Sequence, residues 1–286
     1  MEKDEDGRNK LTHDYVVSVC EFNGQYTTPV CNSQLYLHYK GFEKLENLER
    51  YTKVKSIWLE CNGINKIQGL DHMVGMRCLY LHQNKIPRME NLTFFPKLVI
   101  LNLSHNQIER VEGLENCMEL QTLDLSHNAI TAIADCEQLR ELPKLAHLDL
   151  KNNMIDDKDN VVPFIGALPS IVTISLLNNP CRRMLAGLRR QLILVSETLY
   201  FLDDRPITEL ERKCVKAFEE GGKEAETAVR KQAEIDLRNK LRCGYDKQAR
   251  MEDESRIERK KQFRRMMNDV RQEKESLTTK LENVNR

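Results

Sequence analysis

Two histidines that share the same short sequence are the first residues whose type and spacing could support chemistry. His105 and His127 each lie in a Leu-Ser-His-Asn stretch, 22 residues apart. Two imidazoles brought together by a repeating fold could share a metal ion, but a tetrahedral site needs further ligands, and no cysteine or carboxylate pair completes the set. Phosphate-binding glycine loops, nucleophile elbows and zinc-protease motifs are also missing from the sequence. We therefore expect no metal, no cofactor and no enzymatic activity.

The cysteines indicate a reducing compartment. The chain has nine, an odd number, and they are scattered without a C-x-x-C pair. Secreted repeat proteins usually carry clustered, paired cysteines, so we expect free thiols in a cytoplasmic protein.

Charge and hydropathy exclude several classes of partner. The chain has 286 residues with 44 basic and 44 acidic side chains, so its formal net charge is zero. A neutral chain favours neither nucleic acid nor a membrane surface. No apolar run reaches the ~18–20 residues that span a bilayer, and the charged start, Met1–Asp6, is not expected to be a signal peptide.

Six asparagines at regular intervals organise the middle of the chain. They are Asn62, Asn84, Asn106, Asn128, Asn153 and Asn179. Around Asn106 the apolar residues Leu98, Leu101, Leu103 and Ile108 complete the pattern L-x-x-L-x-L-x-x-N-x-I, which is typical of leucine-rich repeats. Ordinary amphipathic helices would instead give a period of 3.6 residues. Leu101 and Leu103 point to one side of a short strand, and the buried asparagine amide can satisfy the backbone of the sharp turn that follows.

The repeats predict an α/β fold, a right-handed leucine-rich-repeat solenoid of about seven 22–26-residue repeats with terminal caps and a C-terminal helical extension. Lys40 takes the asparagine position in the first repeat. Repeats of 22 residues are too short for full helices on the outer side, so 3₁₀ or irregular turns are expected there. The last two steps are longer, and the additional residues around Cys136–Leu142 and Pro163–Leu168 are expected to form α-helical turns.

We expect five segments along the chain. They are a disordered N-terminus (1–11), an N-terminal cap (12–33), the leucine-rich repeats (34–180), a C-terminal cap (181–222) and a charged helical extension (223–286).

The two caps and the extension have recognisable local signals. Thr12 should cap a short helix in the first segment, and residues 185–195 should form a helix that precedes a last strand at 199–203. Thr208 and Glu211 fit a capping box for a further helix that ends at Gly221-Gly222. In the extension we expect an interruption at Cys243–Tyr245 and then a weak heptad, for which a solvated helix and a coiled coil both remain possible. The heptad residues are Phe263, Val270, Leu277 and Val284.

Residues that alternate with the buried leucines should face the concave side of the solenoid, which we predict to bind protein. The central column is Tyr36, Trp58, Tyr80, Asn102, Asp124, Asp149 and Ser175. The second column is His38, Glu60, His82, Ser104, Ser126, Lys151 and Leu177, and His105 and His127 belong to the same face. Neighbouring strands lie ~4.8 Å apart, so Tyr36, Trp58 and Tyr80 should form one exposed aromatic strip of the kind found at interfaces. The alternative is that long neighbouring side chains merely cover one another.

Three stretches resemble the family of leucine-rich-repeat axonemal dynein assembly factors. They are Leu35–Phe42 (LYLHYKGF), Ile57–Ile64 (IWLECNGI) and Tyr200–Pro206 (YFLDDRP), and the similarity extends over residues 12–222. The resemblance implies a non-enzymatic scaffold that acts in the cytoplasm to pre-assemble dynein arms for motile cilia or flagella. Its implied partners are axonemal dynein chains and assembly chaperones.

Two other functions remain open. The chain could be a resident axonemal or microtubule-associated component that uses its C-terminal helices, where Arg256–Arg265 is rich in basic residues. It could also support RNA–protein assembly, as a spliceosomal leucine-rich-repeat relative does. Interspersed acidic residues favour a solvated helix over a nucleic-acid-binding one.

Overall fold

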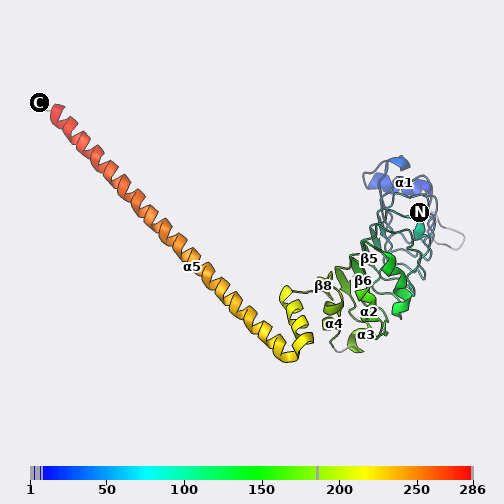
Figure 1. Ribbon diagram of the computed structural model, residues 1–286. Coiled ribbons are helices and arrows are strands. Elements are labelled where there is room, and N and C mark those ends of the chain that lie inside the picture. The colour runs from blue at the N-terminus through cyan, green and yellow to red at the C-terminus, as the bar shows by residue number, and fades with distance from the viewer. Residues whose placement is uncertain (1–2, 4–6, 8, 185–186, 285–286) are drawn as a thin grey trace. The chain divides into compact units, whose positions relative to one another are not determined.

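The computed structural model describes residues 3, 7, 9–184 and 187–284, and these divide into two compact units, Met1–Lys216 and Ala217–Arg286 (Figure 1). In the described residues, no helix combines the length and the apolar character needed to cross a membrane.

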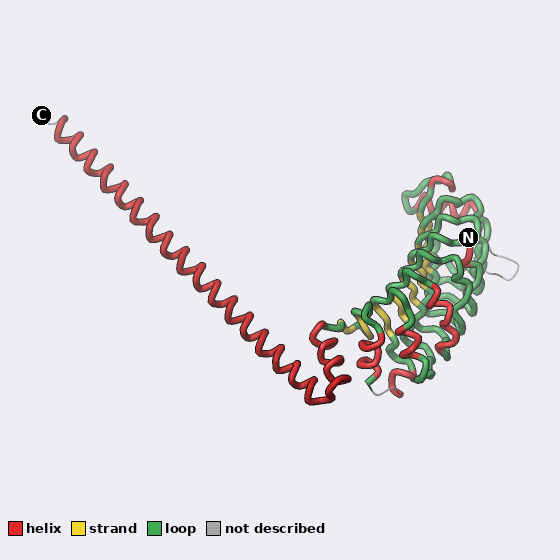
Figure 2. The backbone as a smooth tube through the Cα atoms, viewed as in Figure 1, coloured by secondary structure: helices red, strands yellow, loops and turns green. Residues whose placement is uncertain are grey.

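The first unit is the predicted leucine-rich-repeat solenoid, built on a sheet of short strands that follow one another in chain order. The parallel strands are β1 (Gln34–Tyr36), β2 (Ser56–Trp58), β3 (Cys78–Tyr80), β4 (Ile100–Asn102), β5 (Thr122–Asp124), β6 (His147–Asp149), β7 (Thr173–Ser175) and β8 (Phe201–Leu202). A last strand, β9 (Arg205–Pro206), pairs antiparallel with β8 and was not predicted. Figure 2 shows the strands along one side of the curved solenoid, with loops and short helices on the other.

The register of the sheet follows the leucine pattern. Leu35 pairs with Ile57, and Leu101 pairs with Leu123, so equivalent residues of successive repeats lie side by side. The middle residue of every strand from β1 to β7 is buried, as are the leucines that precede and follow the strands. No repeat could bury these side chains alone, and stacking joins them into one continuous core.

The outer side of the solenoid differs from the prediction in one place. α2 (Val161–Gly166) is an α-helix, as expected near Pro163, but η3 (Ile133–Glu141) is a 3₁₀-helix. The reason lies in the apolar spacing. Ile133, Cys136 and Leu139 are buried at intervals of three residues, which align in a helix of three residues per turn, whereas α2 buries side chains at α-helical spacing. Two further 3₁₀-helices are η1 (Pro29–Cys31) and η2 (Leu92–Phe94).

At the N-terminus, α1 (His13–Phe22) covers the first repeat. Thr12 caps it as predicted, because its hydroxyl accepts a hydrogen bond from the backbone N–H of Tyr15 at 3.3 Å. The disorder predicted for residues 1–11 does not hold at their end: Leu11 is fully buried, and the Asn9 side chain donates to the Lys40 carbonyl at 2.7 Å. Residues 1–2, 4–6 and 8 lie outside the described residues.

The C-terminal cap consists of α3 (Pro180–Met184), α4 (Leu188–Val195) and the β8–β9 pair. Thr208 accepts a hydrogen bond from the backbone N–H of Glu211 at 3.1 Å, which is half of the predicted capping box. The other half is absent because the Glu211 carboxylate instead binds the Arg189 guanidinium at 2.6 and 2.8 Å. This charged contact lowers the pKa of Glu211. Leu185, predicted to belong to the cap helix, lies outside the described residues.

The second unit consists of most of a long helix. This helix, α5, runs from Glu209 to Val284, so its first residues belong to the first unit, and its helical conformation breaks at Gly221 and Gly222, as predicted. The break predicted at Cys243–Tyr245 is wrong, since the helix continues through these residues: a single glycine costs a solvated helix only about 1 kcal/mol. Phe263 is 60% exposed, and the side chains of the other heptad residues, Val270, Leu277 and Val284, lie outside the described residues.

Candidate protein-binding face

Three aromatic rings form a stack on the concave face. The Tyr36 and Trp58 rings lie 4.6 Å apart at 23°, and the Trp58 and Tyr80 rings lie 5.3 Å apart at 16°. They come from equivalent positions of β1, β2 and β3, and the strand register brings them together. All three side chains are half-buried, so they are neither core residues nor fully exposed. We call these three residues the aromatic strip.

The stack decides which parts of the rings a ligand could meet. Both faces of Trp58 are covered by neighbouring rings, so Trp58 can present only its edge to a ligand. Tyr36 already donates its hydroxyl to the side chain of Gln34 at 2.8 Å. Burial raises the pKa of Tyr80, and the Cys78 thiol and the Glu60 carboxylate contribute to the rise. The tyrosine therefore stays protonated and remains a hydrogen-bond donor at neutral pH.

Beside the aromatic strip, the second column begins with His38, Glu60 and His82. Glu60 Oε1 lies 3.7 Å from His38 Nδ1, and the Glu60 side chain is only 13% exposed. In the described residues, Glu60 Oε2, His38 Nδ1 and His82 Nδ1 are buried and have no hydrogen-bond partner.

Further along the central column the side chains turn back on their own backbone. Asn102 Oδ1 accepts the backbone N–H of Ser104 at 3.0 Å, and Asp124 Oδ1 accepts that of Ser126 at 3.0 Å. Asp149 repeats the contact with the N–H of Lys151 at 2.9 Å. Such contacts stabilise the turn that follows each strand.

The remaining side chains of the two columns are ion-paired or buried, so they do not form one accessible binding site. Asp149 also pairs with the Lys151 ammonium at 3.0 Å, which raises the pKa of Lys151. Ser104, Ser126 and Ser175 are buried. Leu177 is half-buried in the turn after β7.

His105 and His127 stack face to face in the turns after β4 and β5, with ring centroids 3.8 Å apart. They thus adjoin the concave strands rather than lie within them, and both have positive φ. Asn152 accepts a hydrogen bond from Asn178 through Oδ1, so its Nδ2 donates to His127 Nε2 at 2.9 Å. Burial lowers the pKa of His127, and the neighbouring His105 and Lys151 lower it further. Within the described part of the chain, no three His, Cys, Asp or Glu side chains are grouped to hold a metal ion.

The six asparagines form a hydrogen-bonded ladder. Asn84 is representative: its Nδ2 donates to the carbonyls of Leu59 and Leu81 at 3.0 and 2.9 Å, and its Oδ1 accepts the N–H of Ile64 at 3.1 Å. One amide thus closes its own turn and ties it to the preceding repeat. Asn62, Asn106, Asn128, Asn153 and Asn179 make equivalent contacts.

The cap contains one buried carboxylate whose role the sequence did not reveal. Asp203 follows Leu202, which pairs with Ile174, so Asp203 extends the register of Ser175 in the central column and is not a member of the asparagine ladder. Its Oδ1 accepts the backbone N–H of Leu176 at 2.8 Å, its second oxygen binds Arg182 Nε at 2.8 Å, and Asp203 is 7% exposed. The guanidinium supplies the positive charge that a buried carboxylate requires.

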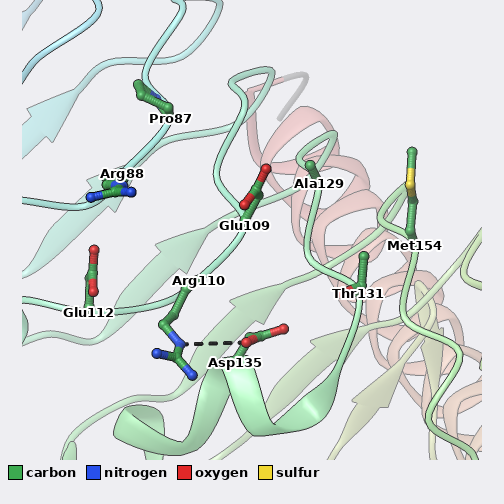
Figure 3. Close-up of a pocket in the computed structure, with 9 residues that line it drawn as sticks. All are labelled: Pro87, Arg88, Glu109, Arg110, Glu112, Ala129, Thr131, Asp135 and Met154. Atoms are coloured by element: carbon green, nitrogen blue, oxygen red, sulfur yellow. Dashed lines mark ion pairs between the residues drawn. The ribbon is translucent and has the colours of Figure 1, made fainter.

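A hollow of about 730 Å³ lies away from the aromatic strip, between the turns of successive repeats (Figure 3). Its charged residues carry both signs, and the Arg110 guanidinium points at the Asp135 carboxylate, with Nε 3.5 Å from Oδ1. The lining residues are Pro87, Arg88, Glu109, Arg110, Glu112, Ala129, Thr131, Asp135 and Met154. Mixed charge and an internal ion pair give this hollow no clear ligand preference.

The repeat region is similar to known leucine-rich-repeat proteins. The family described as leucine-rich repeat matches residues 85–233. The solved structure of an internalin from Listeria monocytogenes aligns with a TM-score of 0.50 and 18% identity, over 73% of this chain and 55% of the internalin chain. At this identity the likeness concerns the fold alone.

Curated relatives of higher identity carry functional names. The chain is 55% identical over 232 residues to the human protein named Dynein axonemal assembly factor 1, which covers 81% of this chain and 32% of that protein. It is 56% identical to the protein of the same name from Peromyscus polionotus, over 81% of this chain and 37% of the relative. It is also 45% identical to the leucine-rich repeat-containing protein ODA7 of Chlamydomonas reinhardtii, over 88% of this chain and 58% of that protein. The chain thus spans about a third of the mammalian relatives, and the resemblance stated from its sequence is confirmed.

Proposed function

Since this chain belongs to the leucine-rich-repeat family, and since its curated relatives are named as axonemal dynein assembly factors, we propose that it is a protein-interaction scaffold for the assembly of axonemal dynein arms. It serves motile cilia or flagella and acts in the cytoplasm before the arms reach the axoneme. Its partners are axonemal dynein chains and the chaperones that fold them. It works by binding, without catalysis.

The aromatic strip carries the proposal that the concave face is the docking surface. Tyr36, Trp58 and Tyr80 stack on one another, and all three side chains are half-buried, so they remain partly accessible to a partner. Tryptophan and tyrosine are, with arginine, the residues enriched at binding hot spots. Asn102, Asp124 and Asp149 of the central column, by contrast, support their own turns.

The test is capture of axonemal dynein heavy or intermediate chains from ciliated-cell cytoplasm by the full chain. Trp58→Ala should reduce capture by roughly 30-fold or more, the cost of losing a hot-spot aromatic. Tyr245→Ala is the matched control, because Tyr245 is 73% exposed on α5. Normal capture by Trp58→Ala contradicts docking on the concave face.

A second function, a resident axonemal component, is separated by the same variants. Loss of capture through Tyr245→Ala alone, together with recovery of the chain in detergent-extracted axonemes rather than cytoplasm, would favour binding through the helical extension. The exposed apolar side chains of α5 are the observation that keeps this alternative open.

A further inference from the structure

The Glu60 carboxylate on the concave face is largely buried, yet one of its oxygens has no hydrogen-bond partner among the described residues. Glu60 follows β2, and its side chain is 13% exposed between the two flanking repeats. Oε2 is buried without a hydrogen-bond partner in the described residues, and Oε1 reaches no closer than 3.7 Å to His38 Nδ1. A carboxylate removed from water is costly unless a cation or several donors compensate it.

Among the described residues, the neighbours of Glu60 do not supply a cation or enough hydrogen-bond donors for its carboxylate. His38 and His82 lie on the neighbouring repeats, and each has a buried Nδ1 without a hydrogen-bond partner in the described residues. Among the residues that the structure describes, no three potential ligands are grouped there for a metal ion. The missing cation is therefore expected to come from another molecule.

The surface beside Glu60 suits a long basic side chain. Trp58 and Tyr80 of the aromatic strip adjoin it, and their edges can cover an alkyl stem, which Lys and Arg commonly bury while the charged end stays polar. A recess of about 430 Å³ opens next to it between α1 and β1. Its apolar and aromatic lining consists of Tyr15, Val19, Tyr36 and Phe22, of which Phe22 is 91% exposed, and its polar lining consists of Ser18, Asn23, His38 and Lys40. The recess can take an apolar side chain adjacent to the basic one.

We propose that Glu60 is a specificity-determining residue that receives a lysine or arginine of a protein partner, while an apolar neighbour of that residue enters the recess between α1 and β1. The proposal rests on the proposed function, since it uses the same face, and it narrows the partner to an extended segment that carries a basic residue beside an apolar one.

The experiment uses the full chain and three capped peptides that differ at one position: acetyl-Leu-Arg-Leu-amide, its citrulline isostere, which is neutral, and its glutamate counterpart. Trp58 is the only tryptophan of the chain, so its fluorescence reports binding at this site. We expect a saturable change with the arginine peptide and binding of the citrulline peptide weaker by roughly 10- to 100-fold, the usual contribution of a hydrogen bond to a charged group. The glutamate peptide should not bind.

Glu60→Gln keeps the shape of the side chain and should abolish the preference for arginine over citrulline. Glu49→Gln is the control, since it makes the same change of charge at an exposed residue in the turn between Leu48 and Tyr51, and it should keep the preference. Absence of a saturable change with the arginine peptide, equal binding of arginine and citrulline peptides, or an unchanged preference in Glu60→Gln would each overturn the proposal.

Dynein capture distinguishes this failure from failure of the proposed function. If Trp58→Ala loses capture and Glu60→Gln retains it, the concave face docks the partner but not through a basic residue. If Trp58→Ala retains capture, the docking surface is wrong, and the peptide measurements still decide whether Glu60 binds a cationic side chain.

Discussion

The central column of the concave face changes its role halfway along the solenoid. In the first three repeats it holds Tyr36, Trp58 and Tyr80, which stack on one another. In the next three it holds Asn102, Asp124 and Asp149, which each bind the backbone N–H two residues further on. The parallel strand register places equivalent residues side by side in both halves, so strand pairing does not explain the difference.

Exposure on the concave face is therefore not enough to identify a binding residue. A short Asn or Asp can reach its own turn and contributes to folding, whereas an aromatic ring cannot make that hydrogen bond and is free to contact a partner. The two halves also share a feature, the asparagine ladder, which runs through both. Substitutions in the ladder and in the column should therefore behave differently.

Among the polar substitutions the largest loss of stability is expected in the ladder, and it should be equal in the two halves. Asn84→Ala and Asn128→Ala each leave one buried backbone N–H without its partner and remove one of the two asparagine donors from each of two leucine carbonyls, so each should lower the free energy of unfolding by about 1–3 kcal/mol. Urea unfolding followed by circular dichroism measures it, with the exposed Gln107→Ala as control. Unequal losses of unfolding free energy would mean that the two halves of the solenoid differ in more than their central-column residues.

Removal of Trp58 should cost less stability than removal of a core aromatic. Two stacked pairs contribute about 0.5–1.5 kcal/mol each, so Trp58→Ala should lower the free energy of unfolding by about 1–3 kcal/mol. Phe95, fully buried, is the comparison, and Phe95→Ala should cost about 3–5 kcal/mol. Equal losses in the two variants would show that the aromatic strip is part of the core.

A smaller effect is expected in the second half of the column. Asp124→Ala removes one hydrogen bond to the N–H of Ser126 and should cost about 1 kcal/mol without loss of dynein capture. Asp124→Asn should be nearly neutral, because Asn102 makes the same contact in the preceding repeat. Reduced capture by Asp124→Ala at normal stability would extend the binding surface into this half.

The smallest effect concerns pH and also belongs to the second half. The pKa of His127 is lowered by burial and by His105 and Lys151, while Asp124 and Asp149 oppose the shift. The folded state therefore binds its proton less readily than the unfolded state, whose pKa is about 6.5. Stability should fall as the pH drops through about 6.5 towards the folded pKa and then level off.

Thermal unfolding between about pH 7.5 and 5 measures this dependence, and NMR titration assigns it to His127. His127→Gln should flatten the fall, whereas His147→Gln, on the exposed His147 of β6, should leave it unchanged. A pKa for His127 at or above the unfolded value would contradict the stacked arrangement.

The repeating parts of the fold could be predicted from the sequence alone. Leucine spacing fixed which residues are buried, and the asparagine period fixed where each strand ends, because every copy of a stacked repeat faces the same neighbours. The same logic predicted that Trp58 lies between Tyr36 and Tyr80, since equivalent positions of parallel strands must be adjacent.

Contacts between unlike residues could be read only from the folded chain. Asp203 is buried because Arg182 of the cap reaches its carboxylate, and Glu211 leaves its capping position because Arg189 offers a stronger, charged partner. Glu60, whose Oε2 has no hydrogen-bond partner among the described residues, belongs to the same class. Periodicity specifies which positions are neighbours, but whether a neighbouring side chain is long enough, charged or already engaged depends on distances that exist only in the folded chain.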